Sequence, residues 1–469
     1  MKKKKLHWSI IIAVGLAIAM IPVPEFEGLE PTAFRLLGIF IATILCFILQ
    51  PVPMGTAALL SVTILVFTKV APMSGVLTGF SSSVTWLVAM AFFLARGFEK
   101  TGLGRRISLM IVRAIGDNSL KLGYAVCLSD LVFGPAIPSF TSRSAGIVFP
   151  VINGLCDVYD SHPGPTANKI GAYLMQLEHQ ATVIVGAMFL TGSTINPLGV
   201  NYTADNAGYS ISWLGWAKAN ALPGLICLLL LPLVLNFLMR PTIKKTPEAP
   251  RMAVEELKKM GSVTKGEKVQ LVVFIACVTA WCTSLWTGLD ATAIAFAAVA
   301  VLLVTSTITW KDCLQVTGAW DVIVWIGVLI TLSGMLTKYG IISWFSSLVG
   351  PLMQGKSWIM VYLILAAIYL WSHYMFASVT SHISSLFAPL LVLMLAAGTP
   401  PAVAAFTLGG FSTMCGALTH YSAGHSPVFY GAGYVNQPTW WKTGFLCSAV
   451  NYVVFIGFGL LWWKLIGLY

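Results

Sequence analysis

Long apolar runs dominate this 469-residue chain and restrict its fold more than any other feature. Hydrophobic residues make up 57% of the sequence, charged residues make up only 10%, and the mean hydropathy is +0.83. Soluble domains carry roughly a quarter charged residues. Lipid cannot hydrogen-bond to a peptide backbone, and the runs lack the period-two alternation of a membrane barrel. The sequence therefore predicts an all-α polytopic membrane protein.

Eleven runs are suited to transmembrane helices, which need about 20 apolar residues each. They are residues 6–23, 32–49, 54–70, 82–98, 170–200, 217–239, 267–287, 290–308, 318–337, 400–430 and 440–466. The first run lacks a small-x-small cleavage site, so we interpret it as a retained span and not as a signal peptide.

The charge distribution predicts how these spans are oriented. The formal net charge is +11, and basic residues concentrate at the N-terminus, around residues 100–121 and in residues 240–268. Such clusters mark cytoplasmic loops and do not indicate a nucleic-acid partner. We therefore expect a protein integral to the cytoplasmic (inner) membrane of a bacterium. Its N-terminus is expected in the cytoplasm and its C-terminus outside.

Two segments of the chain repeat each other at a fixed offset. Ser139-Phe140-Thr141 recurs as Ser378-Val379-Thr380, an offset of 239 residues (139 to 378), and the same offset relates Trp86 to Trp325. Each copy interrupts an apolar stretch, at residues 119–158 and 356–397, which we interpret as two re-entrant hairpins. Five spans separate equivalent elements, so the halves form an inverted repeat whose hairpin tips meet near the membrane midplane.

The repeated residues predict an anion site. Ser and Thr cap helix N-termini, where free N–H groups and the helix dipole favour a carboxylate. Two facing tips suit a dianion with a carboxylate at each end. Arg143 and His382 follow the threonines by two residues, and a membrane-embedded Arg is costly unless it faces a cavity or a partner. The predicted substrate-binding residues are Ser139, Phe140, Thr141, Arg143, Ser378, Val379, Thr380 and His382. The alternative is simple capping, with His382 bonded to a carbonyl group.

Gly, Pro and hydroxyl residues also interrupt the spans 170–200 and 400–430. These breaks are either unwound segments that complete the pocket or proline kinks, and the sequence leaves both interpretations open. The residues that could reach the pocket are Thr194, Asn196, Pro197, Ser422, Ser426 and Pro427. Glu178-His179 could form a gate or a proton site, but a solvated helix end is the favoured interpretation.

Other chemistry finds no support in the sequence. The chain has no nucleotide-binding loop and no H-E-x-x-H zinc motif, which argues against an ATP-driven pump or a metalloprotease. Its nine cysteines are scattered without a C-x-x-C pair, so we interpret them as packing thiols. We therefore expect no cofactor and no bound metal.

These motifs, together with the segments Gly79–Ser82, Thr101–Arg106 and Tyr430–Tyr434, resemble the divalent-anion/sodium symporter (DASS or INDY) family over nearly the whole chain. The resemblance implies a homodimer in membrane lipid, a scaffold domain at the dimer interface and a transport domain that moves like an elevator. It implies di- or tricarboxylate substrates. The family's duplicated Ser-Asn-Thr corresponds to residues 139–141 and 378–380.

The chain departs from this family pattern at both central positions, where Phe140 and Val379 replace asparagine. A desolvated dianion needs countercharges, which either sodium or the protein can supply. Because Arg143 and His382 add basic groups, the chain resembles the exchanger branch of the family. That branch includes citrate/succinate and tartrate/succinate antiporters and plastid oxoglutarate/malate translocators. We expect a secondary transporter, not an enzyme, that exchanges dicarboxylates of the succinate, malate, fumarate and 2-oxoglutarate class without sodium.

The resemblance also implies a division of the chain. Residues 1–117 are expected to form first-half scaffold helices, 118–240 a first-half transport region, 241–266 a cytoplasmic loop, 267–355 second-half scaffold helices and 356–469 a second-half transport region. Three alternatives remain open: a sodium- or proton-coupled di- or tricarboxylate symporter, an anion channel, and an intramembrane Ser/His enzyme that lacks a recognisable nucleophile elbow.

Overall fold

The computed structural model describes residues 28–353 and 355–469, so the predicted span 6–23 lies outside the described residues. Helices supply the regular structure, and no β-strand forms in the described part of the chain. Seven of the described helices are long and apolar enough to cross a membrane. The prediction of an all-α polytopic membrane protein is confirmed. The count of eleven spans stays a prediction.

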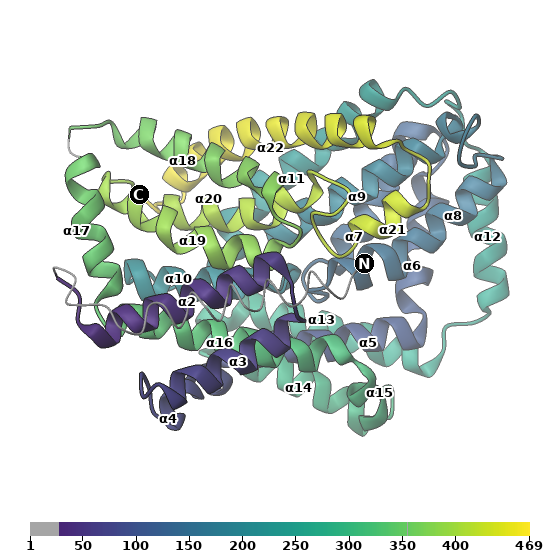
Figure 1. Cartoon of the computed structure of the whole chain (residues 1–469). Helices are drawn as coiled ribbons and strands as arrows, with labels where there is room; N and C mark the ends of the chain where they lie inside the picture. The colour runs from purple at the N-terminus through teal and green to yellow at the C-terminus, as the bar shows by residue number, and fades with distance from the viewer. Residues whose placement is uncertain (1–27, 354) are drawn as a thin grey trace.

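The long helices form two layers (Figure 1). One layer contains α2 (Pro31–Leu49), α3 (Met54–Phe67), α5 (Ser83–Thr101), α13 (Lys265–Thr287), α14 (Ala291–Val304) and α16 (Thr317–Lys338). The other contains α7 (Ser119–Phe133), α9 (Gly171–Met188), α11 (Trp213–Met239), α18 (Trp358–Ser372), α20 (Pro401–Met414) and α22 (Gln437–Leu465). Two further helices, α10 (Asn196–Ala207) and α19 (Val379–Ala396), lie between the layers and contact α16 and α2, respectively.

Shorter helices close the ends of the bundle. The helices α12 (Glu248–Met260) and α17 (Ile341–Met353) lie at opposite ends and run across the direction of the long helices (Figure 1). Ion pairs attach α6 (Leu103–Ile115) to α12 and to the first turn of α13, with Arg105 on Glu256 at 2.7 Å and Arg106 on Glu267 at 2.5 Å. Further short elements are α4 (Met73–Val76), η1 (Thr78–Ser81), η3 (Ala167–Lys169) and α15 (Trp310–Gln315).

Both predicted hairpin segments consist of two helices separated by a break at the repeated motif. In the first, α7 is followed by a turn, by the π-helical segment η2 (Thr141–Val148) and by α8 (Phe149–Val158). In the second, α18 leads through η5 (His373–Met375) into α19. Hydroxyl groups cap both tips as predicted: Ser139 Oγ accepts from the Ser142 N–H at 3.2 Å, and Ser378 Oγ accepts from the Thr380 N–H at 3.2 Å.

The two other predicted breaks are unwound segments. After α9 the chain passes through η4 (Leu190–Gly192) before α10 begins, and after α20 it passes through η6 (Cys415–Ala417) and a non-helical stretch before α21 (Ser426–Gly431). Pro197 and Pro427 lie at the first turns of α10 and α21, where a missing N–H is tolerated. Because neither proline lies inside a continuous helix, the kink interpretation is wrong.

The helix α9 forms the centre of its layer. All 18 of its residues are buried, including Glu178 and His179. The favoured interpretation of these two residues as a solvated helix end is therefore wrong. Two adjacent polar side chains instead lie in the protein interior, close to the broken helices.

Candidate functional site

Both copies of the repeated motif line one cavity of about 360 Å³. The first tip contributes Pro138 to Thr141, the second contributes Ala377 to Thr380, and the unwound segments contribute Thr194 and Ala423-Gly424. Residues 239 positions apart in the sequence thus face the same space, as expected for tips that meet. Six of the eight predicted substrate-binding residues lie here: Ser139, Phe140, Thr141, Ser378, Val379 and Thr380.

The opposite wall of the cavity comes from the other layer. It consists of Gln50 at the end of α2, Phe92 on α5, and Gly318, Asp321 and Val322 on α16. None of the described lining residues is Arg, Lys or His. An anion in this cavity would therefore rely on Ser and Thr hydroxyl groups and on the N-terminal ends of α19 and η2. The cavity therefore lies between the two hairpin tips on one side and the layer that contains α5 and α16 on the other.

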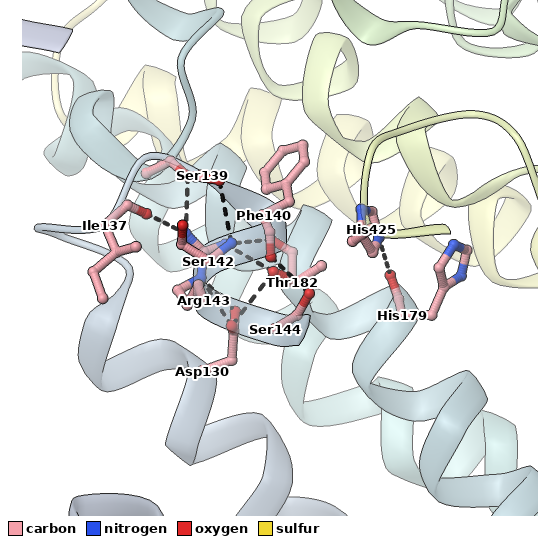
Figure 2. Close-up of polar contacts among 11 residues, drawn as sticks. Asp130, Ile137, Ser139, Phe140, Ser142, Arg143, Ser144, His179, Thr182 and His425 are labelled. Carbon is pink, nitrogen blue, oxygen red and sulfur yellow. Dashed lines mark hydrogen bonds and ion pairs between the residues drawn. The ribbon is translucent and has the colours of Figure 1, made fainter. Parts of the chain in front are cut away.

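Arg143 does not line the cavity, which corrects the predicted site. Its side chain is fully buried and forms an ion pair with Asp130, with Nε at 2.8 and 2.9 Å from the two carboxylate oxygens (Figure 2). Two residues along a helix amount to about half a turn, so a residue two positions after Thr141 points to the opposite side. Asp130 neutralises the positive charge of Arg143, so this residue offers no unpaired charge to an anion in the cavity.

The rest of the guanidinium group is held by oxygen atoms. One terminal nitrogen donates to the carbonyl groups of Ile137 at 2.7 Å and Gly192 at 3.0 Å. The other donates to the carbonyl group of Thr182 at 2.7 Å and to its hydroxyl group at 3.0 Å (Figure 2). We call this set of oxygens the carbonyl cage. Carbonyl, hydroxyl and carboxylate oxygens are also the ligands that hard cations prefer, and the cation that they surround here is the guanidinium group of Arg143.

The cage lies directly behind the cavity. The guanidinium carbon of Arg143 is 5.8 Å from the centre of the Phe140 ring, and Phe140 lines the cavity. The cage also joins the hairpin tip to the unwound segment, since Ile137 belongs to the tip and Gly192 to the break after α9. Arg143 therefore fixes the first tip relative to the first unwound segment, and both contribute to the same wall of the cavity.

His382 is also turned away from the cavity, which is the second correction. It is fully buried, and its Nε2 is 3.1 Å from Ser372 Oγ. Its ring packs against Tyr369, at 4.5 Å between ring centres. The repeat offset holds for these partners as well, because Asp130 and Tyr369 are also 239 residues apart (130 to 369). In each half, the basic residue after the tip contacts the equivalent position of the helix before the tip: Asp130 on α7 for Arg143, and Tyr369 on α18 for His382.

Most of the candidates from the second pair of breaks hold the unwound segments in place and do not line the cavity. Asn196 donates to the carbonyl groups of Gly186 and Phe189 at 2.7 and 2.8 Å. Ser422 bonds to Thr419 within its own loop, and Ser426 Oγ is 2.9 Å from His179 Nε2. Neither Pro197 nor Pro427 is among the lining residues. Of the six candidates, only Thr194 reaches the cavity.

A histidine pair lies behind the Phe140 side of the cavity. His425 Nε2 donates to the carbonyl oxygen of His179 at 3.2 Å, and the two rings are 4.8 Å apart (Figure 2). The Phe140 ring meets His425 edge to face, with 5.5 Å between ring centres. These contacts join α9 to the second break and position Gly424, which lines the cavity.

Sequence reasoning missed two acidic residues of this region. Asp130 pairs with Arg143, and Asp321 lines the cavity. Both lie in apolar stretches, where an ionisable residue marks a functional position by default. That signal was available for both. Gln50 and Phe92 have no comparable signal, because only the fold brings α2 and α5 to the cavity.

Comparisons with known proteins agree with these features. Residues 2–469 match the family described as "Sodium:sulfate symporter transmembrane region". The chain is 44% identical over 463 residues to dicarboxylate transporter 1 of the chloroplast of Spinacia oleracea, covering 98% of this chain and 81% of that protein. It is 42% identical to YflS of Bacillus subtilis, in an alignment that covers 98% of this chain and 96% of YflS. It is 32% identical to the L-tartrate/succinate antiporter of Shigella sonnei, in an alignment that covers 98% of this chain and 99% of the antiporter.

Solved structures support the fold. The MtrF structure from Neisseria gonorrhoeae superposes with a TM-score of 0.57 at 12% identity, covering 97% of this chain and 94% of that one. The YdaH transporter of Alcanivorax borkumensis gives a TM-score of 0.52 at 12% identity, covering 84% and 87%. At such low identity the similarity concerns the fold alone.

Proposed function

Because the chain belongs to the sodium:sulfate symporter family of membrane transporters, we propose that it exchanges dicarboxylate anions across the membrane without sodium. Substrates of the succinate, malate, fumarate and 2-oxoglutarate class fit a cavity with a helix N-terminus on each of two facing tips. The names of a chloroplast dicarboxylate transporter and a tartrate/succinate antiporter among its relatives support this choice of substrate and of exchange.

The observation that carries sodium independence is the filled carbonyl cage. Arg143 brings a permanent cation into a ring of oxygens at the base of the first tip. A guanidinium group stays protonated at all physiological pH values. The cavity wall is therefore stabilised by a cation that belongs to the chain, and no external ion is needed to assemble it.

The same arrangement supports an elevator-like movement. One side of the cavity belongs to residues of the regions 118–240 and 356–469, and the other to Phe92 and to α16. We propose that these two regions form a transport domain that moves against the scaffold of residues 1–117 and 267–355. The segment 241–266, which contains α12, links the two halves of the chain. By the family resemblance, we further propose a homodimer in the cytoplasmic membrane, with the N-terminus inside and the C-terminus outside.

Proteoliposomes test the proposal directly. Vesicles that contain the purified protein and internal succinate should take up labelled succinate or 2-oxoglutarate equally well in sodium and in potassium buffer. Vesicles without internal dicarboxylate should take up little, and vesicles without protein give the background. Strong sodium dependence, or full uptake into empty vesicles, would refute sodium-independent exchange.

One observation favours a second candidate function, proton-coupled symport. Asp321 places a carboxyl group in a cavity that we assign to an anion. A carboxylate there repels the substrate unless a proton accompanies it. The same vesicles decide between the two functions: an inward proton gradient should drive net uptake into empty vesicles under symport and should not under exchange. Asp321→Asn should remove any such effect.

A further inference from the structure

A second buried cluster, outside the candidate site, gathers metal-ligating side chains. His373 on η5, His382 on α19 and Cys415 on η6 are all fully buried. One ring nitrogen of each histidine and the cysteine sulfur lie within 4.8 Å of one another. None of the three lines the cavity. They come from the second hairpin and from the turn that begins the second unwound segment.

The outer hydrogen bonds of this cluster leave lone pairs for a ligand. His373 Nε2 lies 3.0 Å from the carbonyl oxygen of Ser422, so this nitrogen carries the proton and donates. Its Nδ1 is buried and has no hydrogen-bond partner among the described residues. His382 Nε2 contacts Ser372 Oγ at 3.1 Å, while its Nδ1 lies 3.7 Å from Cys415 Sγ. Metal-binding histidines are held in this way, with the outer nitrogen bonded to a carbonyl or another polar group.

A purely structural role for the cluster does not explain why His373 Nδ1 has no hydrogen-bond partner among the described residues. A buried nitrogen without a partner destabilises the folded protein, because the hydrogen bond that it made to water is lost and not replaced. The neighbouring rings of Tyr369 and Phe376 pack against His382 but supply no hydrogen bond to His373 Nδ1. A metal ion at the centre of the cluster would use that free lone pair together with His382 Nδ1 and the sulfur.

We propose that His373, His382 and Cys415 form a binding site for a soft divalent metal ion, Zn²⁺ in the first instance. Two imidazole nitrogens and a thiolate are ligands that Zn²⁺ prefers, whereas Na⁺, Mg²⁺ and Ca²⁺ prefer oxygen. Binding replaces the thiol proton of Cys415, which passes to the solvent. Sequence reasoning expected no metal, because the three residues form no local motif and only the fold assembles them.

Metal binding in this cluster should restrain the second hairpin. Zinc–nitrogen and zinc–sulfur bonds are about 2.0–2.3 Å long, so the ion would draw its ligands closer than they now lie. It would therefore tie η5 and α19, which carry the second tip, to η6, which precedes the second unwound segment. We expect Zn²⁺ to stabilise the protein against heat and to slow any movement that separates these elements.

Metal analysis of the purified full-length protein tests the proposal without a transport assay. After incubation with Zn²⁺ and removal of excess ion, the unsubstituted protein should retain about one zinc per chain. Cys415→Ser and His382→Gln should retain almost none. Cys447→Ser is the matched control, because it removes another buried thiol and should leave zinc binding unchanged. His162→Gln controls for a surface site beside Asp157.

Co²⁺ gives an independent spectroscopic readout, since a cobalt–thiolate bond produces a charge-transfer band in the near ultraviolet. The band should appear in the unsubstituted protein and in Cys447→Ser, and should be missing in Cys415→Ser. If Cys415→Ser does not fold, loss of zinc in His382→Gln decides the question. Equal zinc retention in the unsubstituted protein and in the folded cluster variants, or loss of zinc in His162→Gln alone, would overturn the proposal.

Discussion

At the scale of single residues, the buried pair of Arg143 and Asp130 holds together the elements behind the candidate site. Both side chains are fully buried, and all three guanidinium nitrogens are bonded to oxygen. A buried ion pair is costly to desolvate, but it is costlier to leave half of it unpaired. The pair therefore acts as one unit, and the two substitutions should have different consequences.

Removing the guanidinium group should create a sodium dependence. In Arg143→Ala, the carboxylate of Asp130, the hydroxyl group of Thr182 and three carbonyl groups remain, and these oxygens suit a small hard cation. We expect exchange in potassium buffer to fall by about tenfold or more, and sodium to restore part of it. The measurement is uptake in matched sodium and potassium buffers. Near-normal exchange without sodium would show that the filled cage is not required.

Removing the carboxylate should instead destabilise the protein. Asp130→Asn leaves a buried guanidinium group without its countercharge, which costs about 3–5 kcal/mol. The double variant Asp130→Asn, Arg143→Gln removes both charges and should recover much of that loss. Thermal unfolding in detergent measures both effects. If the single variant unfolds at the temperature of the unsubstituted protein, the ion pair contributes little to stability.

At the scale of elements, the hairpin tip depends on a close contact between Phe140 and α9. A Cβ atom added at Gly186 would lie 2.5 Å from the Phe140 ring, so alanine there would push the ring toward the cavity. Such overpacking typically costs about 1–3 kcal/mol. Gly186→Ala should therefore weaken substrate binding, and Phe140→Leu should relieve the effect in the double variant.

The apparent KM for succinate in exchange vesicles measures this contact. The control is Gly334→Ala on α16, where an added Cβ meets no atom within 4 Å and should leave KM unchanged. If the double variant Gly186→Ala, Phe140→Leu has the same KM as Gly186→Ala alone, then the Phe140 ring does not transmit the effect of the added methyl group to the cavity.

Elements were easier to predict from the sequence than side-chain directions. Apolar runs and Gly/Pro/hydroxyl breaks located both hairpins and both further breaks, because lipid and backbone hydrogen bonding restrict where a helix can be interrupted. They did not decide whether those further breaks are unwound segments or proline kinks. The same reasoning placed Ser139, Thr141, Ser378 and Thr380 at the cavity. It misplaced Arg143 and His382, because it used their distance along the chain and ignored the rotation of the helix.

At the scale of the whole molecule, the cavity is shared between the two layers of the bundle. The tips and unwound segments form one wall, and Gln50, α5 and α16 form the other. Polar contacts also join the proposed transport domain to the scaffold, as in the bond from Ser333 Oγ on α16 to Asp205 on α10 at 2.8 Å. If the proposed transport domain moves past the scaffold, contacts of this kind must break during each cycle.

A reversible cross-link tests that movement. Cysteines at Asp205 and Ser333, in a background with Cys46 and Cys282 replaced by serine, should form a disulfide on oxidation because the native side chains touch. Oxidation should then abolish exchange, and a reductant should restore it. The matched control joins two scaffold helices: cysteines at Thr43 and Ser61, whose hydroxyl groups are 2.7 Å apart, should cross-link without loss of exchange. Full exchange in vesicles whose α10–α16 disulfide is complete would mean that these two helices stay together while substrate crosses, and the elevator-like movement would be refuted.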